Sequence, residues 1–193
     1  MKKSTGFNPR PIIAFGPALS LGISSLSEYF DVKLENKIED IELMRSTLQK
    51  FSEQGIYFNS VEFLESKVKS IQESVSSYTY FFPCEDREKI GEVSEDMLNK
   101  TEINIEYTHH KSGKKVTKEL RSIIQELSYR ELEMNEDQFN LIQEVTNTPL
   151  KSGLEIKIAV SSGVSIKPSE MKMYLENQGL VVDRPVKLAS QIN

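Results

Sequence analysis

The chain has 193 residues, of which 38% are hydrophobic and 27% are charged, and its formal net charge at pH 7 is −5. The apolar content excludes a disordered chain, and the single cysteine excludes a disulfide scaffold and favours a reducing compartment. The mild acidity argues against a protein that coats nucleic acid with its whole surface, because that mode of binding needs many Lys and Arg contacts to phosphates.

The start of the chain is the one candidate targeting segment. Lys2, Lys3 and Arg10 precede an apolar stretch at 12–23, a pattern typical of a weak secretory signal, but Pro17 interrupts the stretch. No apolar run reaches the length of about 18 residues that a membrane-spanning helix needs. We therefore expect a retained N-terminus, a cytoplasmic protein and no membrane span.

Residues 1–25 are predicted to form an extended apolar N-terminal arm. The segment is rich in Gly, Pro and Ser, and these residues disfavour a regular helix. Its large apolar side chains need cover from the rest of the chain or from a partner.

Residues 26–78 are predicted to form an antiparallel helical hairpin. Apolar positions three, four or seven apart indicate a first helix that ends at Gly55. In the second helix, capped by Asn59 and Glu62, the apolar residues alternate steps of three and four, as in a coiled-coil heptad: Val61, Leu64, Val68, Ile71, Val75 and Tyr78. This seam packs either inside the chain or against another chain.

Residues 79–100 are predicted to form an acidic connector. The aromatic residues at 78–82 form a short strand that ends at Pro83, and residues 85–96 then hold six acidic residues against two basic ones. This composition is typical of a solvated segment, with a short helix beginning at Ser94.

Residues 101–193 are predicted to mix strands and helices. The expected elements, in chain order, are a β-hairpin over 103–116, helices over 120–127 and 135–145, a second β-hairpin over 154–166, a helix from Pro168 to Gly179 and a strand over 180–182. The predicted fold class is therefore α+β: an N-terminal antiparallel helical hairpin followed by a mixed region of two β-hairpins and three to four helices.

Glu155 and Lys157 form an enzyme-like pattern. Residues two apart on a strand share a face, so this carboxylate and ammonium could lie beside a bound metal ion and its water, an arrangement that resembles the E-x-K arm of restriction-type nucleases. Glu106 on the first hairpin could supply a further acid. Because Glu and Lys also alternate on ordinary strands, a metal-dependent nuclease or phosphodiesterase is kept as an alternative.

A basic patch is predicted at the tip of the first hairpin. Residues 109–121 carry a net charge of +4 within an acidic chain, from Lys111, Lys114, Lys115, Lys118 and Arg121 against one glutamate. Such a tip either approaches phosphates of nucleic acid or is simply well solvated, so a nucleic-acid binder is a second alternative.

The surface features favour a non-enzymatic protein interaction or assembly subunit, an adaptor that docks on copies of itself or on a different subunit. The residues expected to make this contact lie in the arm and on the seam: Ile12, Ile13, Phe15, Leu19, Val61, Leu64, Val68 and Ile71. The sequence predicts no metal ion, no cofactor and no small-molecule ligand.

Overall fold

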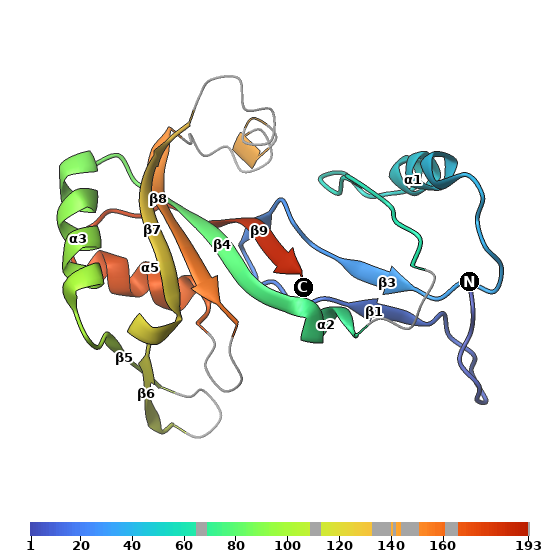
Figure 1. Ribbon diagram of the computed structural model, residues 1–193, viewed down its shortest axis with the longest axis horizontal. Helices are drawn as coiled ribbons and strands as arrows, with labels where there is room; N and C mark the ends of the chain where they lie inside the picture. The colour runs from blue at the N-terminus through green and yellow to red at the C-terminus, as the bar shows by residue number, and fades with distance from the viewer. Residues whose placement is uncertain are drawn as a thin grey trace. The chain divides into compact units, whose positions relative to one another are not determined.

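The computed structural model describes residues 1–64, 69–108, 113–132, 140, 142–143, 151–160 and 166–192. In this part of the chain the fold is mixed α+β, with four α-helices and nine strands in three sheets (Figure 1). The chain divides into two compact units. Unit 1 comprises Met1–Gly16 and Tyr29–Glu73, and unit 2 comprises Pro17–Glu28 and Ser74–Asn193.

Unit 2 is built on a five-stranded sheet. Its strand order is β2 (Ser24–Ser25), β9 (Val186–Ile192), β4 (Val75–Pro83), β8 (Ser152–Ala159) and β7 (Ile124–Glu131). β2 runs parallel to β9, and the other neighbours are antiparallel. The central strand β4 is rich in aromatic and hydroxyl-bearing residues, which pack well on a pleated surface.

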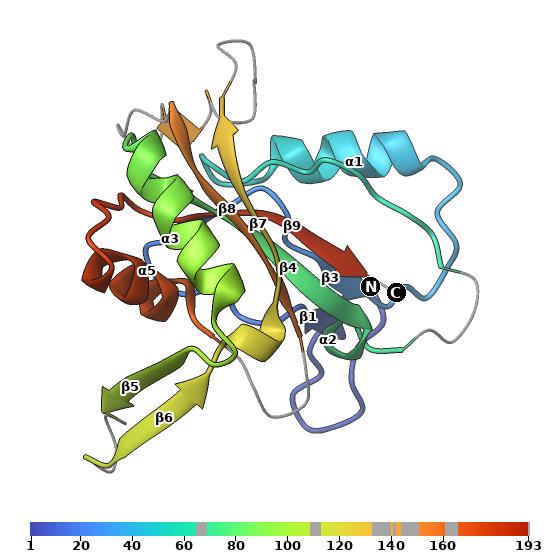
Figure 2. The same cartoon turned by 60° about the vertical axis from the view of Figure 1, so that its left-hand side comes forward.

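One face of this sheet carries the main core. The register pairs Tyr80 with Ile156 and Phe82 with Leu154, so these side chains lie on the same face. The helices α3 (Arg87–Asn99) and α5 (Pro168–Asn177) cover that face (Figure 2). They contribute the buried residues Ile90, Val93, Met97, Met171, Tyr174 and Leu175.

The opposite face holds a smaller apolar cluster around Phe81, whose neighbours include Val186 and Ile142. Gly153 leaves space for the Phe81 ring. A Cβ at Gly153 would lie 2.4 Å from the carbonyl oxygen of Phe82 and 2.8 Å from the Phe81 ring. The close approach of β4 and β8 therefore requires a residue without a side chain at this position.

Local signals set the ends of the two covering helices. The Asp86 carboxylate accepts a hydrogen bond from the Lys89 N–H (2.9 Å) and caps α3, so the helix begins at Arg87 rather than at Ser94 and the acidic stretch is helical. α5 begins with Pro168, and Glu170 accepts from the Lys167 N–H (2.9 Å).

The β5 (Asn104–Thr108) and β6 (Lys115–Glu119) strands pair antiparallel in a separate two-stranded sheet, in agreement with the predicted first hairpin. The Glu119 carboxylate accepts from the N–H groups of Ile103, Arg121 and Ser122 at 2.6–3.2 Å. Burial raises the pKa of Glu119, but these bonds and one from the Ser122 hydroxyl outweigh it and lower the pKa to about 2. Glu119 thereby fixes the 3-10 turn at Arg121–Ile123.

Unit 1 holds a third, two-stranded sheet, in which β1 (Ile13–Phe15) pairs antiparallel with β3 (Phe30–Val32). The helix α1 (Ile41–Lys50) follows after Asp40, whose carboxylate accepts from the Leu43 N–H at 2.8 Å. The four-residue α2 (Ile71–Ser74) comes where the chain passes into unit 2.

The predicted helical hairpin over 26–78 is wrong, and with it the predicted fold. The first predicted helix contains the strand β3, and only Ile41–Lys50 is helical. In the second, 59–64 has no regular structure, α2 is one turn long and β4 begins at Val75. The aromatic and β-branched residues after Ser74 form ladders with both β8 and β9, and this pairing outweighs the helical spacing.

Two further predictions in the second half differ from the structure. Residues 120–127, predicted to be helical, form the 3-10 turn and the start of β7. The last strand is Val186–Ile192 instead of 180–182. Most of the predicted helix over 135–145 and of the return strand over 164–166 lies outside the described residues.

Candidate functional site

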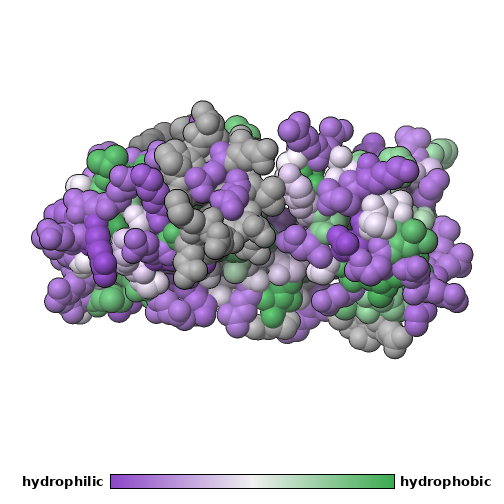
Figure 3. Space-filling model, turned by 90° about the horizontal axis from the view of Figure 1, so that it is seen from above, coloured by the Kyte–Doolittle hydropathy of each residue, from purple (hydrophilic) through white to green (hydrophobic). Residues whose placement is uncertain are grey.

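The large apolar side chains of unit 1 lie mostly at the surface. Of the residues described in this unit, Ile71 is the one that is buried. The exposed ones are Met1, Phe7, Ile13, Phe15, Tyr29, Phe30, Leu43, Phe51, Ile56, Tyr57, Phe63 and Leu64. Figure 3 shows apolar atoms (green) at the surface on the right, on the side where Figure 1 places α1. Where such side chains form a contiguous patch, they mark an interaction site in many proteins.

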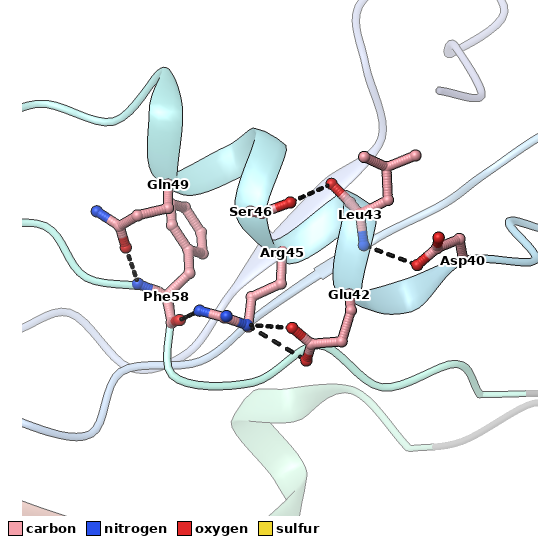
Figure 4. A network of polar contacts seen from close by, with 7 residues as sticks. All are labelled: Asp40, Glu42, Leu43, Arg45, Ser46, Gln49 and Phe58. Carbon is pink, nitrogen blue, oxygen red and sulfur yellow. Dashed lines mark hydrogen bonds and ion pairs between the residues drawn. The ribbon is translucent and has the colours of Figure 1, made fainter.

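One face of α1 binds the chain that follows it. The Gln49 side chain accepts from the Phe58 N–H (2.8 Å) and donates to the Ile56 carbonyl (3.0 Å). Arg45 donates to the Phe58 carbonyl (3.2 Å) and pairs with Glu42 (3.0 Å). Figure 4 shows the Gln49 and Arg45 side chains directed toward the backbone of Phe58, with Glu42 beside Arg45. The polar face of the helix is thus the face that contacts its own chain.

The opposite face of α1 is apolar and open. It forms one side of a groove of about 400 Å³. The groove is lined by Ile38, Asp40, Leu43, Met44, Thr47 and Leu48. Leu43 is 62% exposed, and no residue of α1 is buried. Ile38, Met44 and Leu48 are half-buried, so the exposed apolar area of the groove comes chiefly from Leu43, a kind of residue that an amphipathic surface helix normally turns inward.

A row of aromatic rings links the β1–β3 sheet to the segment that follows α1. The Phe15 and Phe30 ring centroids are 6.0 Å apart, and Phe30 and Phe58 meet edge to face at 6.1 Å. Phe15 is nevertheless 64% exposed. These rings stabilise the β1–β3 pair locally but still present apolar area to solvent.

The first residues form a closed loop, here called the N-terminal loop (residues 3–11). The Ser4 N–H donates to the Arg10 carbonyl (2.8 Å), the Arg10 N–H donates to the Ser4 hydroxyl (3.1 Å), and Lys3 and Pro11 form a β-bridge. Phe7 lies in this loop and is fully exposed. The bonds across its base hold the loop in a defined conformation.

The structure divides the predicted docking residues. Ile12, Ile13 and Phe15 lie in or beside β1 in unit 1, whereas Leu19 is half-buried in unit 2. On the predicted seam Val61 is half-buried, Leu64 is exposed, Ile71 is buried and Val68 lies outside the described residues. The sequence reasoning missed the open groove and Phe7. The N-cap at Asp40 would have indicated where α1 begins.

Glu155 and Lys157 share a face of β8, as their spacing indicates, but each is paired with a charge on β7. Glu155 binds Arg130 (2.9 Å), and Lys157 binds Glu126 (3.0 Å). Glu106 lies on β5, in a different sheet. Within the described residues no group of three or more His, Cys, Asp or Glu side chains lies close enough to hold a metal ion.

The predicted basic patch is partly used inside unit 2. Lys118 forms an ion pair with Glu170 of α5 (2.7 Å), in which the two side chains are 17% and 12% exposed. Arg121 donates to the carbonyls of Leu98 and Ile124. Lys114 and Lys115 are exposed, and Lys111 lies outside the described residues. The cations left at the surface of the tip are fewer than the sequence suggested.

A buried charge lies on the strand β9 of the large sheet. Lys187 of β9 is buried, and its ammonium is 2.7 Å from the Glu28 carboxylate and 4.7 Å from the centre of the Tyr78 ring. Burial, together with the charges of Tyr78 and Glu28, raises the pKa of Tyr80. The ion pair and the ring contact compensate the burial of the lysine charge. Through them Lys187 links β9 to the segment after β2.

Comparison with known proteins identifies the family. A family model described as "Uncharacterized protein conserved in bacteria (DUF2344)" matches residues 1–168, and the chain belongs to this family. Neither the curated proteins nor the solved structures gave a match. Of the helices in the described ranges, none combines the length and apolar character needed to cross a membrane.

Proposed function

We propose that this protein is a non-enzymatic interaction or assembly subunit that binds another protein through the apolar surface of unit 1. The observation that carries the proposal is the orientation of α1: Arg45 and Gln49 are bonded to residues 56 and 58, while the exposed Leu43 and the half-buried Met44 line a groove. A partner that covered the groove would remove this apolar area from water, which is the main favourable term in protein association.

The polar contacts of α1 make the groove a fixed feature. Rotating the helix to bury Leu43 would break the bonds from Arg45 and Gln49 to the backbone at 56–58. Each such bond contributes roughly 0.5–1.5 kcal/mol, and more where a charged group takes part. A docking partner therefore meets a preformed groove and need not reorder the helix, which lowers the entropic cost of binding.

Cytoplasmic location is part of the same proposal. Cys84, the single cysteine of the chain, is a buried free thiol. A free thiol needs no oxidation to a disulfide, which fits a protein of the reducing cytoplasm.

Photo-crosslinking in the cells that produce the protein tests the proposal. A photoreactive amino acid replaces Leu43 in the groove. In a matched control it replaces Lys114, an exposed residue directly before β6 in unit 2. We expect covalent adducts to a defined protein, which includes a second copy of this chain, from position 43 and not from position 114. Equal adduct patterns at the two positions, or none at position 43, would refute the proposal.

The two alternative functions are tested on the purified protein. Glu155 and Lys157 are bound in ion pairs, so we expect no cleavage of plasmid or oligonucleotide with Mg²⁺ or Mn²⁺. With Lys118 and Arg121 bonded inside unit 2, we also expect no salt-sensitive binding to DNA or RNA. A positive result in either assay would favour the corresponding enzyme or nucleic-acid function.

A further inference from the structure

We infer that the partner of the α1 groove is a second copy of this chain, whose N-terminal loop inserts Phe7 into the groove. This inference rests on the proposed function and names the occupant of the same surface. Two observations support it. The exposed Phe7 side chain matches the apolar groove, and the N-terminal loop and the segment 35–42 carry opposite charges.

The first feature is the match between an apolar side chain and an apolar groove. Phe7 is fully exposed in a loop that two hydrogen bonds between Ser4 and Arg10 hold closed. The groove of about 400 Å³ is lined mainly by apolar side chains of Ile38, Leu43 and Met44. An aromatic side chain that enters a concave apolar pocket is the usual anchor of a protein interface.

The second feature is the distribution of charge. The N-terminal loop and its base carry Lys2, Lys3 and Arg10 and no acidic residue, so the segment 2–10 has a net charge of +3. The segment 35–42, of which Ile38 and Asp40 line the groove, has four acidic residues against one lysine, a net charge of −3, although Glu42 is paired with Arg45. Opposite charges around an apolar contact favour encounter and fix the orientation of docking.

The arrangement of unit 1 favours contact between copies over contact within one copy. In both ribbon views the N-terminal loop leaves the β1–β3 pair on the side away from α1 (Figures 1 and 2). The loop of one chain therefore lies apart from its own groove. A reciprocal exchange of loops between two chains gives a closed dimer, whereas a one-way contact gives an open series.

Sedimentation of the purified full chain tests this inference. The mass is measured at concentrations from about 1 to 200 µM, a range that brackets weak and moderate protein affinities. We expect the mass to rise from that of one chain with concentration, and Phe7→Ala to weaken the association at least about tenfold. Leu21→Ala is the matched control, because Leu21 is also fully exposed but lies in unit 2.

A charge exchange gives a second, independent readout. Lys3→Glu and Glu39→Lys should each weaken the association, and a mixture of the two single variants should associate better than either alone, because each loop can then meet a groove of opposite charge. Raising NaCl from about 50 to 500 mM should weaken the wild-type contact.

The possible results separate this inference from the proposed function. A mass of one chain over the whole concentration range, or an association that Phe7→Ala leaves unchanged, would overturn the second-copy inference. If the crosslinks from position 43 then identify a different protein, the proposed function stands without it. If those crosslinks are also absent, both fail.

Discussion

Replacing Gly153 by alanine should destabilise unit 2 far more than the same change elsewhere. The added Cβ would lie 2.4 Å from the Phe82 carbonyl oxygen and 2.8–2.9 Å from the Phe81 ring. The oxygen belongs to the backbone of the central strand, so it cannot move without shifting the β4–β8 ladder. Overpacking of this kind costs about 1–3 kcal/mol and occasionally more, and we expect about 3 kcal/mol here.

Urea unfolding followed by circular dichroism measures this loss. With a slope of about 2 kcal/mol per M, a loss of about 3 kcal/mol lowers the midpoint by about 1.5 M. Gly91→Ala is the matched control: Gly91 lies inside α3, and nothing lies within 4 Å of its would-be Cβ. Alanine should stabilise that helix by about 0.5–1 kcal/mol. If Gly153→Ala lost less than about 1 kcal/mol, the tight strand approach would not exist.

Two further predictions concern charged groups. The lowered pKa of Glu119 means that its ionised form stabilises the fold above the unfolded pKa of about 4.5, and this contribution is lost as pH falls from there through about 2. Glu119→Gln should therefore flatten the dependence of the urea midpoint on pH over that range. An unchanged slope would contradict the assignment. Glu170→Gln removes the carboxylate that is paired with the largely buried Lys118 and should cost about 1–3 kcal/mol in urea unfolding. The control Glu85→Gln, whose ion pair is 3.8 Å long with both side chains 75% exposed, should change stability by less than about 0.5 kcal/mol, and equal losses would show that burial does not matter here.

Local chemistry made some elements predictable. Pro168 at the first helical position and the positive φ of Gly179 bracket α5 close to its predicted ends. Alternating apolar residues located β8 from Leu154 onward, and turn residues that include Gly113 located the β5–β6 hairpin. In each case the signal lies within the element itself, so no distant partner was needed to interpret it.

The helical hairpin failed because its signal was ambiguous without knowledge of distant partners. Val75 and Tyr78 continue a three-four spacing from Ile71, yet both lie in the central strand of the sheet. What decides their conformation is the ladder with β8 and β9, whose paired residues come about 80 to 117 positions later in the chain. Tertiary pairing of this kind outweighs local periodicity.

The candidate site was predictable only in part. An apolar front segment that needs cover was evident from Ile13 and Phe15, and both are exposed in the structure. The groove was not evident, because the spacing of Leu43, Met44 and Leu48 indicates an apolar helix face without showing whether that face turns inward. The bonds of Arg45 and Gln49 to the following segment determine this, and they depend on the path of the chain after the helix.

The position of β9 in the sheet has a consequence for biosynthesis. β9 is the last described strand to leave the ribosome, yet it lies between β2 and β4 and also carries Lys187, the partner of Glu28. Until it emerges, one side of β4 has open backbone groups, a state that invites aggregation of nascent chains. Translation that stops before Val186 would therefore release a polypeptide with β2 unanchored and the centre of the sheet exposed, a natural substrate for chaperones and proteases.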